Sequence, residues 1–281
     1  MARYDMLFFD LDGTLLSPDH RTVSPGNQEA LREAGRAGVR LVIATGRCLA
    51  MIPREVLDLE QLDFAVTSNG AAVYDLRQER QERQIRQAPF PAGEAAVACE
   101  IIERYLDFYE LFVGGQVLLI RSPRAEAAGC DLPPWGHFYL ERRGSVPPMT
   151  GIRPFLEEGA PGLEKINIIH CPPSDLFRLR DELAATGLFD LSASMGYGGL
   201  EVVPRACSKG SAVRWLCGEL GIAASRCAAF GDSGNDRDML AAVGCGVAME
   251  NAPEDLKAAA HCVAPPYDRD GIAVFIRQEV L

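Results

Sequence analysis

The sequence predicts an α/β fold in which a parallel sheet is interrupted by a second, inserted α+β domain. Apolar runs of strand length alternate with helical patterns at both ends of the 281-residue chain, which is typical of a parallel sheet with helices on both faces. The middle of the chain shows hairpin patterns and a mixed order of elements instead. We therefore assign residues 1–82 and 203–281 to a first domain and residues 83–202 to a domain inserted in it.

The first domain is expected to form a Rossmann-like sheet. Its N-terminal elements are a strand Met6–Phe9, a helix Pro25–Ala37, a strand Val39–Ala44, a helix through Leu57 and a strand Phe64–Thr67. Its C-terminal elements are a helix Lys209–Leu220, a strand Cys227–Phe230, a helix after Asn235, a strand Cys245–Ala248 and a helix near Glu254.

A hairpin of Ala72–Tyr74 and Arg83–Arg86 leads into the inserted domain. The elements expected there are a helix Glu94–Tyr105, strands Tyr109–Val113, Gln116–Arg121 and Lys165–Ile169, a helix Ser174–Ala185, and strands Asp190–Ser194 and Leu200–Val203. The segment Ser122–Pro161 is rich in Pro and Gly and receives no assignment. Ligands of open parallel sheets bind beyond the carboxyl ends of the strands, so an inserted domain at that edge would close over the site as a lid.

Composition excludes several classes of function. The content of 48% hydrophobic and 24% charged residues is that of a globular protein, and no apolar run approaches the ~20 residues of a membrane helix. Nine scattered cysteines without a C-x-x-C pair or a signal peptide predict reduced thiols and a cytoplasmic location. A net charge of −11 without a basic stripe disfavours nucleic acid, whereas a small anionic ligand could still be held by local positive charge. The oligomeric state is not readable.

Two acidic clusters follow predicted strands. Asp10 and Asp12 lie in LFFDLDGTLL, and Asp232 and Asp236 lie in FGDSGNDRDML. If one sheet edge gathers these carboxylates, they repel one another unless a positive charge lies among them, and Mg²⁺ is the economical candidate. Asp10, directly after its strand, is placed to act as a nucleophile, and Asp12 as an acid and base. Taken alone, each cluster is also explained by helix capping or an acidic turn.

Two further positions suit phosphate. Thr45, Gly46 and Arg47 follow the second strand, where a hydroxyl and backbone N–H groups would face the same sheet edge, although a Thr N-cap with a Gly turn is the better account of the T-G pair taken alone. Lys209 begins a helix, where its charge opposes the helix dipole and so indicates another role, although a solvated surface lysine is the simpler account.

The order of these motifs is more specific than any one of them. With DxDGT, TGR, a lysine and GDxxND at successive strand-to-helix junctions, the chain resembles the haloacid dehalogenase-like (HAD) hydrolases, and within them the Cof-type subfamily IIB with a C2B-type cap domain. The segments SNGA, EVVPRACSKG and VAMENAPEDLKAAA extend the resemblance over most of the chain. Glu250 replaces a glycine usual in the family, and PPYDRDGIA departs from its shorter loop.

The resemblance implies a Mg²⁺-dependent phosphatase of small phosphorylated metabolites. It implies that Asp10 attacks phosphorus, that Asp12 protonates the leaving alcohol and later activates water, that Thr45 binds the phosphoryl group and that Lys209 pairs with Asp10. Mg²⁺ would be held by Asp10, the carbonyl of Asp12 and Asp232, with Asp236 as a ligand or its support. The substrate side would be formed by Thr45, Gly46, Arg47, Asn69, Lys209 and Asn235.

Two alternatives and the identity of the substrate stay open. A phosphomutase of the phosphomannomutase type resembles this chain around the first motif, and a phospho-accepting signalling module uses similar residues but lacks the D-x-D spacing and the inserted cap. A sugar phosphate, pyridoxal phosphate and flavin mononucleotide are all reasonable substrates. Cap residues should choose among them, and the candidates, most of which are otherwise ordinary surface residues, include Arg121, Arg124, Arg142, Arg143, Lys165 and Tyr197.

Overall fold

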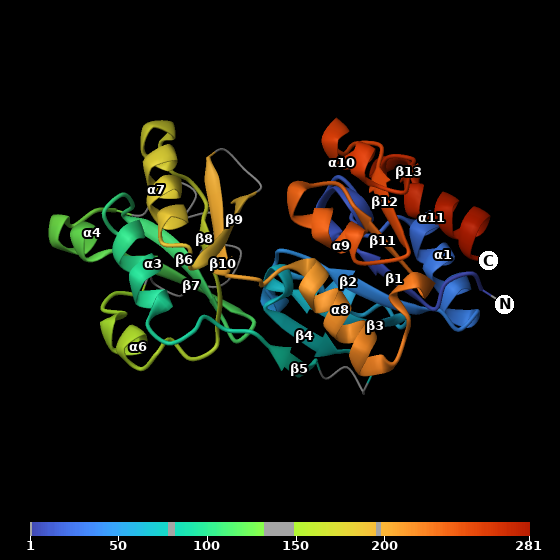
Figure 1. The fold of residues 1–281 in the computed structure, drawn as a ribbon, viewed down its shortest axis with the longest axis horizontal. Coiled ribbons are helices and arrows are strands. Elements are labelled where there is room, and N and C mark those ends of the chain that lie inside the picture. The colour runs from blue at the N-terminus through green and yellow to red at the C-terminus, as the bar shows by residue number, and fades with distance from the viewer. Residues whose placement is uncertain (1, 78–81, 132–148, 195–197) are drawn as a thin grey trace. The chain divides into compact units, whose positions relative to one another are not determined.

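The chain forms two compact units, and each is described by itself. The computed structural model describes residues 2–77, 82–131, 149–194 and 198–281. The core unit comprises Met1–Ala88 and Ala206–Leu281, and the inserted unit comprises Pro89–Arg205 (Figure 1). Among the described residues, every helix is too short or too polar to span a bilayer.

The core unit contains an eight-stranded sheet with the order β13-β12-β11-β1-β2-β3-β4-β5. The strands from β13 to β3 are parallel, and β4 and β5 extend the sheet in antiparallel pairs. The strands are β1 (Met6–Phe9), β2 (Arg40–Ala44), β3 (Leu62–Thr67), β4 (Ala72–Asp75), β5 (Arg83–Gln87), β11 (Cys227–Gly231), β12 (Cys245–Met249) and β13 (Cys262–Ala264). The predicted α/β class is confirmed.

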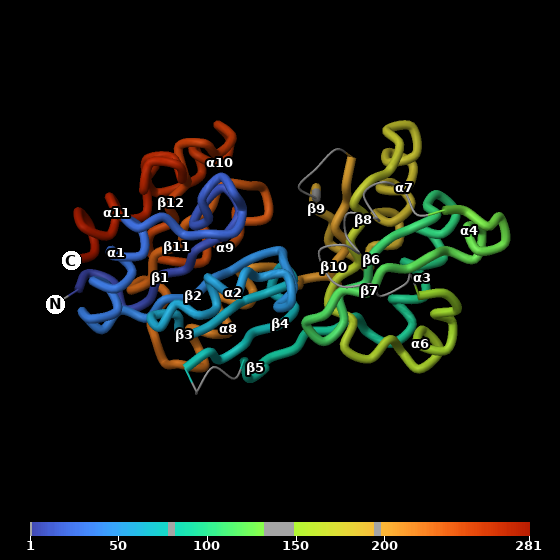
Figure 2. Tube along the Cα trace, turned by 180° about the vertical axis from the view of Figure 1, so that it is seen from behind, coloured from blue at the N-terminus to red at the C-terminus, as the bar shows by residue number. Residues whose placement is uncertain are grey.

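Helices cover both faces of this sheet, which explains why the central strand β1 is apolar and buried at every position. One face packs against α1 and α11, and the other packs against α8, α9 and α10. The helices of this unit are α1 (Pro25–Arg36), α2 (Arg54–Leu57), α8 (Lys209–Leu220), α9 (Arg237–Ala241), α10 (Glu254–Ala259) and α11 (Gly271–Phe275). The two ends of the described chain lie side by side, because the Arg3 amide donates to the Val280 carbonyl at 3.0 Å (Figure 2).

The inserted unit is an antiparallel sheet with the order β7-β6-β8-β10-β9. One face carries the apolar core against α3 and α7, and polar side chains are buried elsewhere on the same strands. The elements are α3 (Glu94–Ile102), β6 (Phe108–Val113), β7 (Gln116–Arg121), α4 (Pro123–Ala128), α6 (Arg153–Glu157), β8 (Leu163–Ile168), α7 (Pro173–Ala185), β9 (Phe189–Ser194) and β10 (Gly199–Pro204). Helices α4 and α6 lie in the segment that the sequence left unassigned.

Both predicted domain boundaries differ by a few residues from the limits of the two compact units. The sequence places the first boundary after residue 82, but β5 pairs with β4 in the core sheet, so that this unit continues to Ala88. The second boundary was predicted after residue 202, whereas Arg205 still hydrogen bonds to Leu188 of the inserted unit. Local pattern does not reveal which sheet a hairpin joins, because that choice depends on pairing between distant segments.

Candidate active site

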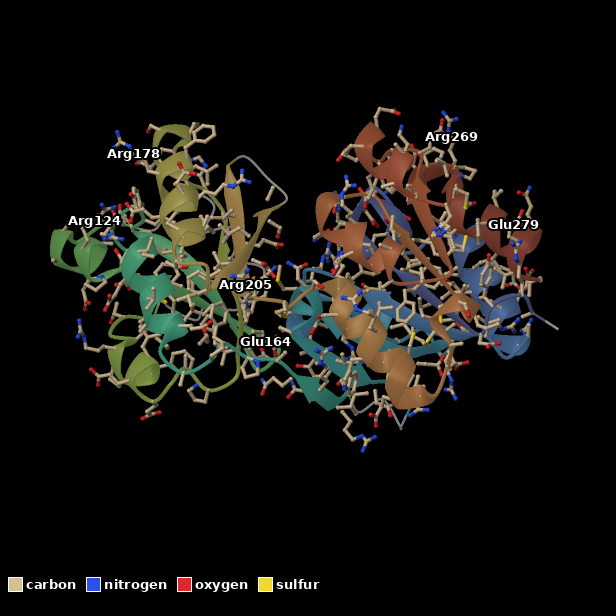
Figure 3. The ribbon with its side chains drawn as sticks, in the orientation of Figure 1. Arg124, Glu164, Arg178, Arg205, Arg269 and Glu279 are labelled. Carbon is tan, nitrogen blue, oxygen red and sulfur yellow. The ribbon has the colours of Figure 1, made fainter. Side chains whose placement is uncertain are left out.

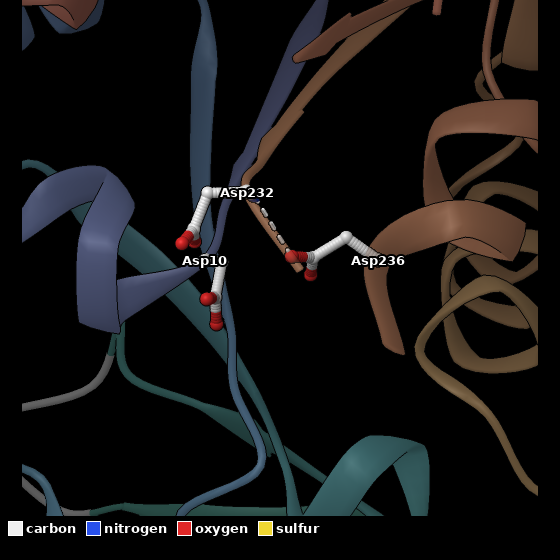
Figure 4. Close-up of side chains that lie close together, drawn as sticks. All are labelled: Asp10, Asp232 and Asp236. Carbon is white, nitrogen blue, oxygen red and sulfur yellow. Dashed lines mark hydrogen bonds between the residues drawn. The ribbon is translucent and has the colours of Figure 1, made fainter. Parts of the chain in front are cut away.

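Two neighbouring strand ends bring the acidic clusters together. Strands β1 and β11 pair in parallel, with Phe9 opposite Phe230, so Asp10 and Asp232 leave the sheet at the same edge. Asp236 follows in the short 3₁₀ turn Gly234–Asp236. One carboxylate oxygen from each of Asp10, Asp232 and Asp236 lies within 4.8 Å of the other two (Figure 4). Chain topology therefore closes the gap of more than 200 residues between the clusters.

Lys209 lies between two of these carboxylates. Its ammonium donates to Asp10 Oδ1 at 2.8 Å and to Asp236 Oδ1 at 2.7 Å, and its side chain is almost fully buried. Ser208 caps α8 by accepting from the Ser211 amide, which sets where the helix starts. Gly70, at φ 99°, allows the SNGA loop to touch this start, because a Cβ there would lie 2.1 Å from the Ser208 carbonyl oxygen. The unfavourable position of Lys209 on the helix dipole is thus offset by two ion pairs.

Burial and mutual repulsion dominate the electrostatics of the cluster. Burial raises the pKa of Asp10 well above its ordinary value, against the lowering effect of Lys209. Burial, together with repulsion from Asp236, raises the pKa of Asp232 to about 6. Burial by itself would lower the pKa of Lys209, but the carboxylates of Asp10 and Asp236 raise it, so the ammonium stays charged. The lysine therefore neutralises only part of the negative charge.

The donor set fits a divalent cation. When all three carboxylates are ionised, they and the ammonium carry two net negative charges, which one Mg²⁺ ion would balance, and carboxylate oxygens are the ligands that this ion prefers. Asp236 is already engaged, because its Oδ2 accepts from the amides of Asp232 at 3.0 Å and Ser233 at 2.9 Å. These bonds orient Asp236 toward the cluster.

Asp12 lies in a separate ion pair at the same edge. Arg47 Nε donates to Asp12 Oδ2 at 2.7 Å, its Nη2 donates to Oδ1, and His20 Nδ1 lies 2.9 Å from Oδ1. Burial acts to raise the pKa of Asp12, but the bonds from Arg47 and His20 outweigh it, and the pKa is lowered. Asp12 is therefore held in its charged form.

The other predicted residues occupy neighbouring loops. Thr45 is buried, and its hydroxyl oxygen accepts from the Arg47 amide at 3.1 Å. Asn235 Nδ2 donates to Asn69 Oδ1 at 3.1 Å, which joins two residues predicted for the substrate side. Gly46 lies between Thr45 and Arg47 in the loop after β2. The roles predicted for these residues in binding substrate stay predictions.

Sequence reasoning missed three residues of this site. Thr14 Oγ1 donates to Asp232 Oδ1 at 3.0 Å, and Asn251 Nδ2 donates to the Gly13 carbonyl at 2.9 Å. Thr14 belongs to DxDGT and Asn251 to VAMENA, so both stood in segments that were already noticed. His20 lies in an irregular loop, and its spacing gives no signal of its contact with Asp12.

The residues predicted to select the substrate in the inserted unit differ in how far they are buried. Lys165 is buried and donates to Glu201 Oε1 at 2.5 Å, which corrects its expected place on the surface. Arg121 is partly buried, with its guanidinium 5.6 Å from the Phe108 ring centre. Arg124 is exposed, as expected, and bonds to Asp107 on the outside of the unit (Figure 3). The remaining candidates lie outside the described residues: Arg142, Arg143 and Tyr197.

Comparison with known proteins shows the family of this chain. The model of the haloacid dehalogenase-like hydrolase family matches residues 7–276. The chain is 31% identical over 258 residues to an HMP-PP phosphatase of Serratia proteamaculans, covering 90% of this chain and 86% of the relative. It is 29% identical over 282 residues to the phosphatase YwpJ of Bacillus subtilis, covering 95% and 97% of the two chains.

Solved structures show the same two-part architecture. A haloacid dehalogenase-like hydrolase of B. subtilis superposes with a TM-score of 0.77 at 27% identity, covering 98% of this chain and 99% of the other. A subclass IIB sugar phosphatase of the HAD superfamily superposes with a TM-score of 0.77 at 25% identity, covering 97% and 98%. The chain therefore belongs to the haloacid dehalogenase-like hydrolases, as a phosphatase of the Cof-type subfamily IIB.

Proposed function

We propose that this protein is a Mg²⁺-dependent phosphatase that hydrolyses small phosphorylated metabolites through a phosphoryl group carried on Asp10. The observation that supports this most directly is the placement of Asp10, Asp232 and Asp236 around Lys209 at one edge of the core sheet. Phosphoryl transfer depends on positioning and on neutralising charge, and this arrangement supplies both.

The ion would be held by carboxylate oxygens of Asp10 and Asp232 and by the backbone carbonyl of Asp12, with Asp236 as a ligand or its support. When bound, Mg²⁺ neutralises charge on the phosphoryl oxygens and on the attacking carboxylate. The loop between the ligands is compact, because a Cβ at Gly13 would lie 2.3 Å from Asp232 Oδ2. A side chain at residue 13 would displace a metal ligand.

The remaining steps belong to the protein's own groups. A carboxylate oxygen of Asp10 bonds to phosphorus while the ester P–O bond breaks and the alcohol leaves with a proton. Water then attacks the phosphorus of the aspartyl phosphate, which releases inorganic phosphate and restores the carboxylate. Lys209 holds Asp10 in position for the attack and offers positive charge to the transferring oxygens, and Thr45 binds the phosphoryl group.

Asp12 carries the proton in both steps. The pair with Arg47 and His20 keeps it ionised, which is the form that accepts a proton from the attacking water. Donation to the leaving alcohol requires the protonated form, which this pair disfavours. The contact with Arg47 therefore governs the balance between the two roles.

The substrate is proposed as a class. A relative named HMP-PP phosphatase and a solved structure named a sugar phosphatase point to small phosphorylated metabolites, and pyridoxal phosphate and flavin mononucleotide belong to the same range. The inserted unit is proposed to select among them. A panel of these compounds assayed for phosphate release would rank them, and transfer of phosphate to a second sugar position without release would indicate a phosphomutase instead.

The proposal is tested with the purified chain and para-nitrophenyl phosphate. We expect hydrolysis that stops in EDTA, returns with Mg²⁺ and falls by at least about 10³-fold in Asp10→Asn. A quenched reaction should contain protein heavier by one phosphoryl group, which Asp10→Asn lacks. Asp5→Asn is the matched control, because Asp5 precedes the same strand at its opposite end and pairs with Arg226. Hydrolysis that survives both EDTA and Asp10→Asn would contradict the mechanism.

A further inference from the structure

Asn251 connects the loops that follow four adjacent strands of the core sheet. It lies two residues after β12, in the VAMENA segment. Its Nδ2 donates to the Gly13 carbonyl at 2.9 Å, in the loop after β1, and lies 3.4 Å from Asp232 Oδ2, in the loop after β11. Its Oδ1 accepts from the Tyr267 amide at 3.3 Å, in the loop after β13. One side chain therefore contacts the first acidic cluster, the second acidic cluster and the last loop.

These partners determine the orientation of the amide and the type of residue. The two groups at Nδ2 are both acceptors, and the group at Oδ1 is an N–H donor, so the reverse orientation would place like groups against each other at all three contacts. Aspartate has the same shape but lacks the donor, and leucine lacks both functions. An asparagine is the residue that matches this set of partners at this length.

Asp232 is thereby held at both of its oxygens. Thr14 Oγ1 donates to Oδ1 at 3.0 Å, and Asn251 Nδ2 approaches Oδ2. A carboxylate with a donor on each oxygen has its rotamer and its plane defined before any ligand arrives. Hydrogen-bonded partners of metal ligands commonly change metal affinity by about 10- to 100-fold when they are removed.

Asn251 itself is exposed, whereas Asp10 and the strand ends beside it are buried. It therefore adds little apolar burial to the fold, and its loss creates no cavity in the core. We propose that Asn251 is a positioning residue that sets Asp232, and the Gly13 turn beside it, for binding Mg²⁺. This inference rests on the proposed function, because it concerns the same metal site.

The test compares Asn251→Ala with the neighbouring variant Glu250→Ala. Glu250 is exposed in the same loop and takes the place of a glycine usual in the family. Mg²⁺ binding to metal-free protein is measured by calorimetry, and Tm is measured in EDTA. We expect Asn251→Ala to weaken Mg²⁺ binding about 10-fold or more with little change in Tm, and kcat at saturating Mg²⁺ to return toward the wild-type value. Glu250→Ala should match the wild type in every measurement.

A second variant keeps the test decisive. Asn251→Leu preserves the shape of the side chain and removes its hydrogen bonds, so it should repeat the loss of Mg²⁺ affinity if Asn251→Ala folds poorly. Wild-type affinity in a folded Asn251 variant, while the wild type binds Mg²⁺ and hydrolyses ester, would overturn this inference alone. A wild type that neither binds Mg²⁺ nor hydrolyses phosphate esters would overturn the proposed function and this inference with it.

Discussion

Lys209 in the core unit and Lys165 in the inserted unit are two of only three lysines in the chain, and each is 1% exposed. Lys209 begins a helix and pairs with carboxylates that come from the loop after β1 and the turn after β11. Lys165 lies within β8, pairs with Glu201 on the adjacent strand β10 at 2.5 Å, and lies 4.5 Å from the Phe112 ring centre. One lysine connects loops at a sheet edge, and the other connects strands within a sheet.

The charge around each lysine differs as well. Three carboxylates gather at Lys209, so negative charge remains after the lysine is counted. Among the residues described in the inserted unit, no group of three possible metal ligands gathers in this way. Excess negative charge at strand ends destabilises the fold, so its presence indicates a site for a positively charged ligand. A buried ion pair within a sheet leaves no excess charge and needs no ligand to account for it.

Lys209→Met should have the largest effect. It removes the cation that contacts Asp10 and Asp236, so we expect kcat for para-nitrophenyl phosphate to fall by about 10³-fold or more. Without the lysine the carboxylates repel one another, so Tm in EDTA should fall, and saturating Mg²⁺ should restore much of it. Turnover near the wild-type value would remove Lys209 from the proposed mechanism.

Lys165→Met should act on stability without any dependence on Mg²⁺. It leaves the buried Glu201 carboxylate without its lysine, which typically costs about 3–5 kcal/mol of the free energy of unfolding. Urea denaturation with and without Mg²⁺ measures this loss, which should be the same in both. The double variant Lys165→Met/Glu201→Gln should recover part of it. If Mg²⁺ restored the free energy of unfolding of Lys165→Met, the proposed difference between the two lysines would be wrong.

Arg47→Met should change the pH dependence of catalysis. Arg47 offsets the effect of burial and lowers the pKa of Asp12, so its removal raises that pKa and lets the protonated form persist to higher pH. The alkaline limb of the pH profile of kcat/KM should shift to higher pH, and the rate at neutral pH should change by about 10- to 100-fold. The matched control is Arg226→Met, which breaks a pair with Asp5 at the other end of β1. An unchanged profile would separate Asp12 from the rate-limiting proton transfer.

Asp75→Asn should have the smallest effect, because Asp75 has two arginine partners and carries no excess negative charge. Hydrogen bonds from Arg77, assisted by Arg83, lower the pKa of Asp75 to about 2. A pKa lowered by folding stabilises the protein above the unfolded value of about 4, and this contribution is lost as the pH falls toward 2. Since both arginines are exposed to solvent, we expect a loss of about 1 kcal/mol at pH 7 that shrinks near pH 3, measured by urea denaturation.

Structure was predicted correctly from the sequence where the pattern of a single segment was sufficient to identify its element. The alternation of apolar runs and helical patterns was enough for the parallel sheet, and Lys209–Leu220 was predicted with the bounds that α8 has. The carboxylates of Asp10 and Asp232 were placed at one edge because each directly follows a strand. The hairpin of β4 and β5 was also found, but not the sheet to which it belongs.

Prediction failed where a residue acts through a distant partner. His20 lies in a loop without a pattern, and its contact with Asp12 depends on how that loop returns to the sheet edge. Lys165 reads as a strand residue that could face solvent, and only the pairing of β8 with β10 shows that it is buried beside Glu201. The role of Asn251 likewise depends on three loops that meet.

The sequence by itself determined the fold class, the inserted arrangement and the acidic residues of the site, because periodicity and the order of motifs along the chain are local properties. The pair of Lys209 with Asp10 was already implied by the resemblance to the family. Only the tertiary structure decided the other charge pairs: Lys209 with Asp236, Arg47 and His20 with Asp12, and Lys165 with Glu201. The reason is physical, since an ion pair depends on distance and burial, and both are set by the packing of segments that lie far apart in the chain.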